Sequence, residues 1–186
     1  LNCSFCSVSA FNGKSYRHRS IPDVIADFRL LREKRVLIVD DNLIGISKKQ
    51  IARTKELLRA MISADLGKTW ICQATINIAD DDELLELARQ AGCTGVFIGF
   101  ESPTAEGLME VHKRYHVQRE RDFPASVRRI QRHGITVAGS FIIGLDVDRP
   151  GIGRRIAEAA SAYHLDFLNV MFLTPLPGTA LWQKME

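Results

Sequence analysis

Short apolar runs rich in β-branched residues alternate with longer amphipathic stretches five times along the chain. Such continuous apolar runs are typical of strands that are buried on both faces of a parallel sheet. We therefore predict five strands, at about Val36–Val39, Thr69–Ile76, Gly95–Phe100, Ile135–Ile143 and Leu165–Phe172.

The stretches between the runs have the periodicity of helices. The first of them begins at Ser20-Ile21-Pro22-Asp23, where a serine N-cap, an early proline and an acidic residue three positions after the cap signal a helix start. The predicted helices span about 20–34, 47–63, 80–91, 104–112, 123–133 and 149–163, and one more follows the proline-rich turn at 174–179.

This alternation predicts βαβ units and an α/β fold with one parallel sheet, in a single domain. Right-handed crossovers then allow either an open doubly wound sheet or a barrel. Both architectures place functional residues at the carboxyl ends of the strands.

Polar residues do gather where the apolar runs stop. They are Asp40-Asp41-Asn42, Glu101-Ser102, Asp146 and Thr174. Helix capping and solvation are the alternative explanation, and capping alone is our expectation for Asp146 and Thr179. Three consecutive polar residues after the first run exceed what a cap requires.

Bulk composition narrows the class of protein. The 186 residues are 46% hydrophobic with a net charge of +3, an excess too small to favour nucleic acid as a partner. No apolar run approaches the roughly 20 residues that span a bilayer, and no signal peptide is visible. The chain opens with Leu1 and stops at Glu186 within a helical pattern, so we expect both ends to be cuts in a longer protein.

Four cysteines bear on the chemistry. Cys3 and Cys6 form a C-x-x-C pair, whereas Cys72 and Cys93 stand alone in apolar surroundings, where buried thiols are expected. This is not the pattern of a secreted disulfide scaffold, and it fits a reducing, cytoplasmic setting. The pair is compatible with a redox dithiol, a zinc site completed by Cys72 and Cys93, or an iron–sulfur cluster.

The cysteine loop resembles that of the radical S-adenosylmethionine (SAM) superfamily, whose signature is C-x-x-x-C-x-x-C with an aromatic residue before the last cysteine. Cys3-Ser4-Phe5-Cys6 matches the last two cysteines and the aromatic residue. The first cysteine would lie four residues before Cys3, upstream of Leu1. We therefore predict that the chain, as it stands, does not assemble a competent cluster.

The resemblance extends to the strand ends, in the family's order. It implies a SAM amino-group contact at Asp40, Asp41 or Asn42, and ribose and carboxylate contacts at Glu101 and Ser102. It further implies that Phe5 lies beside the adenine and that the fifth barrel strand, with Ser140 and Phe141, flanks it. Leu173 and Thr174 resemble the end of the sixth strand.

Within the superfamily, the combination of the cysteine loop, Tyr16-Arg17-His18-Arg19-Ser20, Val39-Asp40-Asp41-Asn42 and the 174–179 turn is most similar to the cobalamin-associated branch. Members of that branch commonly carry a separate B12-binding domain, which implies cobalamin in the full-length protein. The implied fold is a partial (β/α)6 barrel lacking its first strand, with residues 1–186 as the core domain and 1–19 as the cluster loop.

The resemblance implies a [4Fe-4S] cluster held by Cys3, Cys6 and the upstream cysteine, with one iron open to SAM. Reductive cleavage of SAM would give a 5′-deoxyadenosyl radical for methylation or rearrangement of a small molecule, with flavodoxin or ferredoxin as electron donor. No catalytic residue is identified beyond the cluster ligands. Two alternatives stand beside this one: a tRNA-modifying, methylthiotransferase-like enzyme, and a non-enzymatic barrel with a structural zinc site at Cys3 and Cys6.

The stretch between His112 and His133 is strongly basic, and it raises the possibility of RNA or an anionic substrate. Its cations are Lys113, Arg114, Arg119, Arg121, Arg128, Arg129 and Arg132. Our interpretation is a solvated helix face and linker, because charge runs of this kind usually cover a helix surface.

Overall fold

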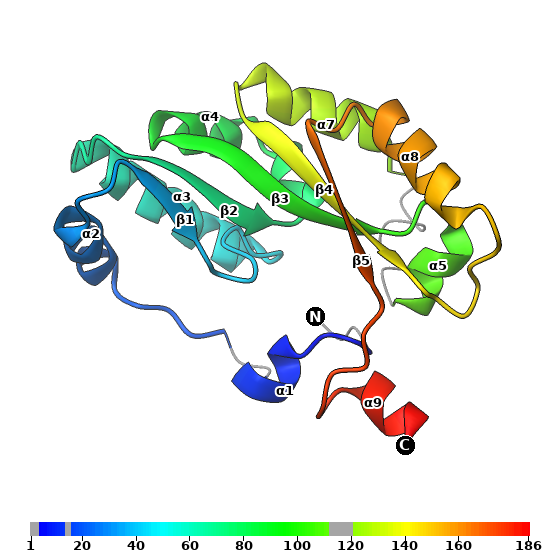
Figure 1. The fold of residues 1–186 in the computed structure, drawn as a ribbon. Helices are drawn as coiled ribbons and strands as arrows, with labels where there is room; N and C mark the ends of the chain where they lie inside the picture. Colours follow the sequence, from blue (N-terminus) through cyan, green and yellow to red (C-terminus); the bar gives the residue numbers. More distant parts are fainter. Residues whose placement is uncertain (1–3, 14–15, 112–120) are drawn as a thin grey trace.

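The computed structural model describes residues 4–13, 16–111 and 121–186. Their core is one sheet of five parallel strands in the order β1-β2-β3-β4-β5. The strands are β1 (Arg35–Ile38), β2 (Thr69–Ala74), β3 (Cys93–Glu101), β4 (Thr136–Ile143) and β5 (Phe167–Phe172). The sheet curls into a half-barrel (Figure 1), which decides between the two predicted architectures in favour of the barrel.

Helices cover one face of this sheet and leave the other face open (Figure 1). The long connections are α3 (Lys48–Ser63), α4 (Asp82–Gln90), α7 (Phe123–Arg132) and α8 (Ile152–Ala162). Shorter elements are α1 (Val8–Asn12), α2 (Ile21–Leu30), the 3-10 helix η1 (Ile76–Asp80), α5 (Ala105–Glu110) and α9 (Ala180–Met185). Among the described residues, no helix is long and apolar enough to cross a membrane.

The predicted helix starts follow the expected chemistry. Ser20 caps α2 by accepting a hydrogen bond from the Asp23 amide, as its motif predicts. Ser47 and Gln50 form a reciprocal capping box at the start of α3. The second predicted strand is shorter than expected, because the chain turns into η1 at Ile76.

The core lies between the sheet and its helices. Alternate strand residues point into it, as the buried positions Trp70, Cys72 and Ala74 of β2 show. The residues between them, Ile71 and Gln73, are exposed on the open face. This alternation decides which strand residues can reach a ligand inside the half-barrel.

Candidate functional site

The predicted polar residues lie where β1, β3 and β5 end, along one edge of the half-barrel. The strands are all parallel, so their carboxyl ends share this edge. The segment that contains α1 and the cysteine loop lies along the same edge, near α9 (Figure 1). We call this edge, together with the cysteine loop, the mouth.

At the end of β1, the three polar residues have different environments. Asn42 is buried, and its side-chain amide donates to Thr75 Oγ1 (3.3 Å) while its Oδ1 accepts from the Gly45 amide (3.2 Å). Asp40 and Asp41 are exposed. Asn42 therefore shapes the turn, and the two carboxylates are the groups open to a ligand.

The Tyr16 hydroxyl donates to the backbone carbonyl of Asn42 at 2.5 Å. Partial burial, and secondarily the negative charges of Asp40 and Asp41, raise the pKa of Tyr16. The phenol is therefore held neutral as a donor, and it fixes the segment after the cysteine loop to the end of β1.

The end of β3 is strained. Glu101 has φ +67°, a left-handed conformation that non-glycine residues rarely adopt, and the pairing of β3 with β4 shifts between Gly99 and Glu101. Strain of this kind costs about 1–3 kcal/mol and concentrates at functional sites. The backbone at this position supports the prediction that Glu101 contacts a ligand.

Ser102, by contrast, is turned into the protein. It is 2% exposed, and its hydroxyl accepts from the Thr104 amide (3.2 Å) just before α5. A Cβ on Gly107 of α5 would lie 2.1 Å from this hydroxyl. Ser102 therefore seats α5 on the end of β3 instead of facing the mouth.

In β4, the adjacent residues Ser140 and Phe141 lie on opposite faces of the sheet. The Phe141 ring stacks on Phe100 with centroids 5.7 Å apart, and Phe100 also contacts Phe123 of α7 at 5.3 Å. Phe141 is fully buried under the helices. The structure thus does not bring it to the open face, where a cofactor would lie.

Ser140 is paired with Asn169 of β5, whose side-chain amide donates to the serine hydroxyl at 3.2 Å. Apart from Thr136 at the start of β4, the other residues of these two strands are apolar. Sequence reasoning missed Asn169, although an asparagine within the apolar run of β5 is the kind of exception that signals a polar role.

The end of β5 meets the cysteine loop. Phe5 and Leu173 both pack against a small buried cluster formed by Val111, Ile142 and Leu145. Thr174 is exposed and donates to the Phe172 carbonyl (3.0 Å). Phe5 and Leu173, predicted separately from the sequence, are therefore brought together.

A backbone hydrogen bond fixes the loop to the segment after β5: the Leu181 amide of α9 donates to the Ser4 carbonyl at 2.9 Å. With the Tyr16 contact at the other side, the loop is attached near both β1 and β5. Cys6 is half-buried within it, and Cys3 lies outside the described residues.

The remaining cysteines are core thiols, as predicted. Cys72 and Cys93 are 1% and 3% exposed. A hydrogen bond with Cys93, followed by burial, raises the pKa of the Cys72 thiol, which keeps it protonated. In the part of the chain that the structure describes, no three metal-binding side chains gather, so Cys72 and Cys93 do not complete a zinc site with Cys6.

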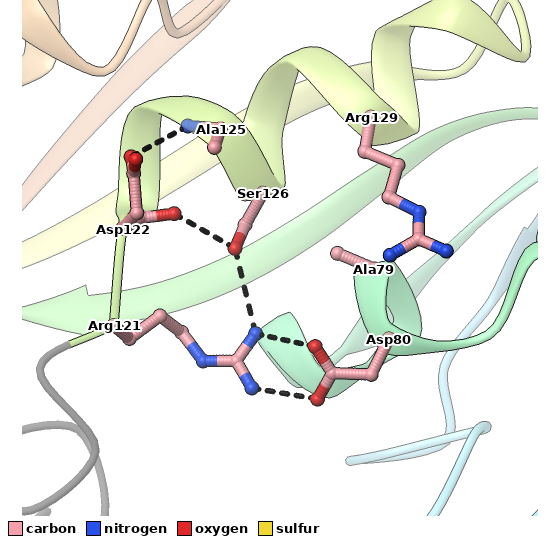
Figure 2. Close-up of a pocket in the computed structure, with 7 residues that line it drawn as sticks. All are labelled: Ala79, Asp80, Arg121, Asp122, Ala125, Ser126 and Arg129. Carbon is pink, nitrogen blue, oxygen red and sulfur yellow. Dashed lines mark hydrogen bonds and ion pairs between the residues drawn. The ribbon is translucent and has the colours of Figure 1, made fainter.

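The basic stretch makes internal ion pairs where it is described. Arg121 binds both oxygens of Asp80 (2.9 and 2.6 Å), and Arg129 donates to Asp82 (2.7 Å). Asp80, Arg121 and Arg129 border a cavity of about 310 Å³ between η1 and α7 (Figure 2). Residues 112–120 lie outside the described part. The pairing supports a helix-surface role for these two arginines.

Two expectations about caps had different outcomes. Thr179 caps α9 by accepting from the Trp182 amide (3.2 Å), as expected. Asp146 does not cap a helix: its carboxylate pairs with Lys184 at 2.9 Å. The amides of Gly144 and Leu145, directly after β4, are instead bound by the Asp148 carboxylate.

The fold and the site together define a parallel α/β half-barrel with a cysteine loop attached across the ends of its strands. The sequence model of the radical SAM superfamily matches residues 1–150, and the chain belongs to this superfamily.

Curated relatives include methylating enzymes. The chain is 29% identical to the hopanoid C-2 methylase of Rhodopseudomonas palustris, over 99% of the chain and 35% of that protein. It is 31% identical to the bacteriochlorophyllide d C-12(1)-methyltransferase of Chlorobaculum tepidum, over 100% of the chain and 40% of that protein. The chain thus spans well under half of these relatives.

Solved structures share the fold. The radical SAM methyltransferase TsrM of Kitasatospora setae, solved with cobalamin and a [4Fe-4S] cluster, aligns with a TM-score of 0.82 at 21% identity, over 97% of this chain and 36% of that one. Coproporphyrinogen III oxidase of Escherichia coli aligns with a TM-score of 0.65 at 17% identity, over 99% of this chain and 44% of that one. The partial barrel expected from the sequence is thereby confirmed.

Proposed function

We propose that residues 1–186 form the core domain of a radical SAM methylase, which binds a [4Fe-4S] cluster and SAM at the mouth and methylates a small molecule. The observation that carries this proposal is the attachment of the cysteine loop across the strand ends, by Tyr16 near β1 and by Ser4 near β5. Attachment at both sides keeps the loop, with Cys6 in it, at the mouth.

The loop contains residues of the type that binds an iron–sulfur cluster. Cys6 is a free, half-buried thiol at the mouth, and thiolates are the usual ligands of iron–sulfur clusters. Cys3 and Cys6 would hold two irons. The family's signature has a third cysteine four residues before Cys3, so we propose that the protein continues upstream of Leu1.

The mouth also fits SAM. The exposed carboxylates of Asp40 and Asp41 can accept hydrogen bonds from a cationic amino group, and Glu101 can accept them from ribose hydroxyls. A cavity of about 230 Å³ next to Phe5 and Leu173 offers an apolar wall to the adenine. Phe141 is left out of this proposal because it lies in the core.

When bound and reduced, the cluster supplies the electron that cleaves SAM. The chain itself binds the cluster and SAM, orients SAM, and excludes water from the site. Its loop holds the thiolates, and its strand-end carboxylates orient the amino acid and ribose portions of SAM. The half-buried Asn169 amide, held by the buried Ser140 hydroxyl, is a polar group among the apolar residues of β5.

Methylation is favoured over rearrangement because both relatives described above are named for it. Cobalamin, bound outside residues 1–186, and a flavodoxin- or ferredoxin-type electron donor in the cytoplasm complete the proposal.

The test is made on a protein extended upstream past the missing cysteine. It is reconstituted with iron and sulfide without oxygen, reduced, and examined by EPR with and without SAM. A [4Fe-4S] signal that changes on adding SAM supports an open iron and SAM binding. A protein without a cluster, or with a cluster indifferent to SAM, contradicts the proposal.

A further inference from the structure

Four consecutive backbone N–H groups follow β4, and each has a carboxylate partner. The amides of Gly144 and Leu145 donate to Asp148 Oδ2 (2.8 and 3.0 Å). Those of Asp146 and Val147 donate to the carboxylate of Glu110, one to each oxygen (2.9 and 3.2 Å). A run of N–H groups like this one can bind an external anion, but here carboxylates of the chain itself occupy it.

The two carboxylates do different things. Asp148 belongs to the same turn and closes it locally. Glu110 is the last residue of α5, 36 residues before Asp146, so its contact fixes the turn to another element. Since α5 is seated on Ser102 through Gly107, Glu110 connects the end of β3 to the end of β4.

The turn held by Glu110 forms one wall of the mouth. Leu145 is a buried member of the cluster against which Phe5 and Leu173 pack. Glu110 and Leu145 also border the 230 Å³ cavity that Phe5 lines. A shift of the turn would therefore displace the surface on which the cysteine loop rests.

We propose that Glu110 is a positioning residue for SAM binding. It holds the turn 144–147 with both carboxylate oxygens and thereby sets the shape of the cavity beside Phe5. The inference rests on the proposed function, in which the adenine occupies that cavity. Glu110 acts through the turn, and its role requires no contact with SAM.

The experiment compares Glu110→Gln with Glu106→Gln in the upstream-extended, cluster-loaded protein. Glutamine keeps the size of Glu110 but replaces one of two acceptor oxygens with an NH2 group, which leaves an amide of the turn unsatisfied. Glu106 is exposed on the same helix and serves as the control. SAM affinity is measured by equilibrium dialysis without oxygen, and amide hydrogen exchange is followed at residues 144–147.

We expect Glu110→Gln to raise the Kd for SAM about tenfold, to speed exchange at 144–147, and to leave iron content unchanged. Glu106→Gln should match the wild type in all three. An unchanged Kd in Glu110→Gln, or an equal loss in Glu106→Gln, would overturn the inference.

If Glu110→Gln does not fold, two measurements on the wild type still test the role of Glu110. Amides 144–147 that exchange as fast as an exposed loop, with or without SAM, would overturn the role of Glu110. A wild type with slow exchange at these amides but no SAM binding would instead overturn the proposed function, and the inference with it.

Discussion

The Tyr16 hydroxyl donates a hydrogen bond to the backbone carbonyl of Asn42 and so joins the segment after the cysteine loop to the end of β1. The two residues are far apart in the sequence, and Asn42 is itself fixed by Thr75 and Gly45. The loop is thus attached to a rigid turn on this side of the mouth.

Tyr16→Phe removes this contact while keeping the ring. We expect a loss of about 1 kcal/mol in the free energy of unfolding and a lower yield of cluster, because the loop is then attached firmly only near β5. Denaturant unfolding and iron analysis test both. An unchanged iron content would show that the contact does not matter for the loop.

The same variant should also change how the free energy of unfolding depends on pH. The pKa of Tyr16 is raised in the folded protein, so its contribution to stability is complete below the unfolded pKa of about 10 and is lost as the pH rises toward the folded value. Above pH 10, the free energy of unfolding should therefore fall more steeply for the wild type than for Tyr16→Phe. Parallel curves would contradict this assignment.

The strain at Glu101 can be separated from the function of its side chain. Glycine adopts a positive φ freely, whereas alanine does not. We expect Glu101→Gly to be about 1 kcal/mol more stable than Glu101→Ala, and both to bind SAM more weakly than the wild type. Thermal unfolding and SAM dialysis measure the two effects. Equal stability of the two variants would argue against backbone strain at this position.

Gly107 is required for α5 to approach β3. Gly107→Ala would place a Cβ 2.1 Å from Ser102 Oγ and 2.6 Å from Ser102 Cβ, and we expect a loss of about 1–3 kcal/mol. Adding Ser102→Gly should restore part of this loss. Gly153→Ala in α8, where the structure shows open space, is the control and should be neutral or slightly stabilising. A tolerated Gly107→Ala would mean that α5 can shift without cost.

Because Ser140 and Phe141 lie on opposite faces of the sheet, their replacement by alanine should destabilise the protein to different degrees. Phe141→Ala should cost about 3–5 kcal/mol of stability, because it opens a cavity among Phe100, Phe123 and Tyr163. Ser140→Ala should cost only about 1 kcal/mol, by removing the acceptor of Asn169. Denaturant unfolding of both variants checks the assignment, and a reversed order would contradict it.

The sequence predicted the elements well because their signals are local. The serine cap of α2 and the apolar runs of the strands depend on residues within a few positions of one another. The mouth was only partly predictable, since a shift of one residue moves a strand side chain to the other face. Phe141 was therefore expected at a ligand and lies in the core, while Asn169 lies beside Ser140 and was missed.

Long-range contacts had no signal in the sequence at all. The partnership of Glu110 with the amides of Asp146 and Val147 depends on how α5 is seated against β3 and β4. The same holds for Asp146, whose expected cap is replaced by an ion pair with Lys184 in α9. Residue type and spacing predicted polar groups at the strand ends, but their partners depend on the tertiary fold.

The most direct test of the central claim compares Cys6→Ala with Cys93→Ala in the upstream-extended protein, by iron analysis and by the change in EPR signal on adding SAM. Cys6 lies in the loop at the mouth, and Cys93 is a buried core thiol. We predict that Cys6→Ala loses the SAM-dependent change and most of the iron, and that Cys93→Ala retains both. Retention of the SAM-dependent signal in Cys6→Ala would show that this loop does not hold the cluster.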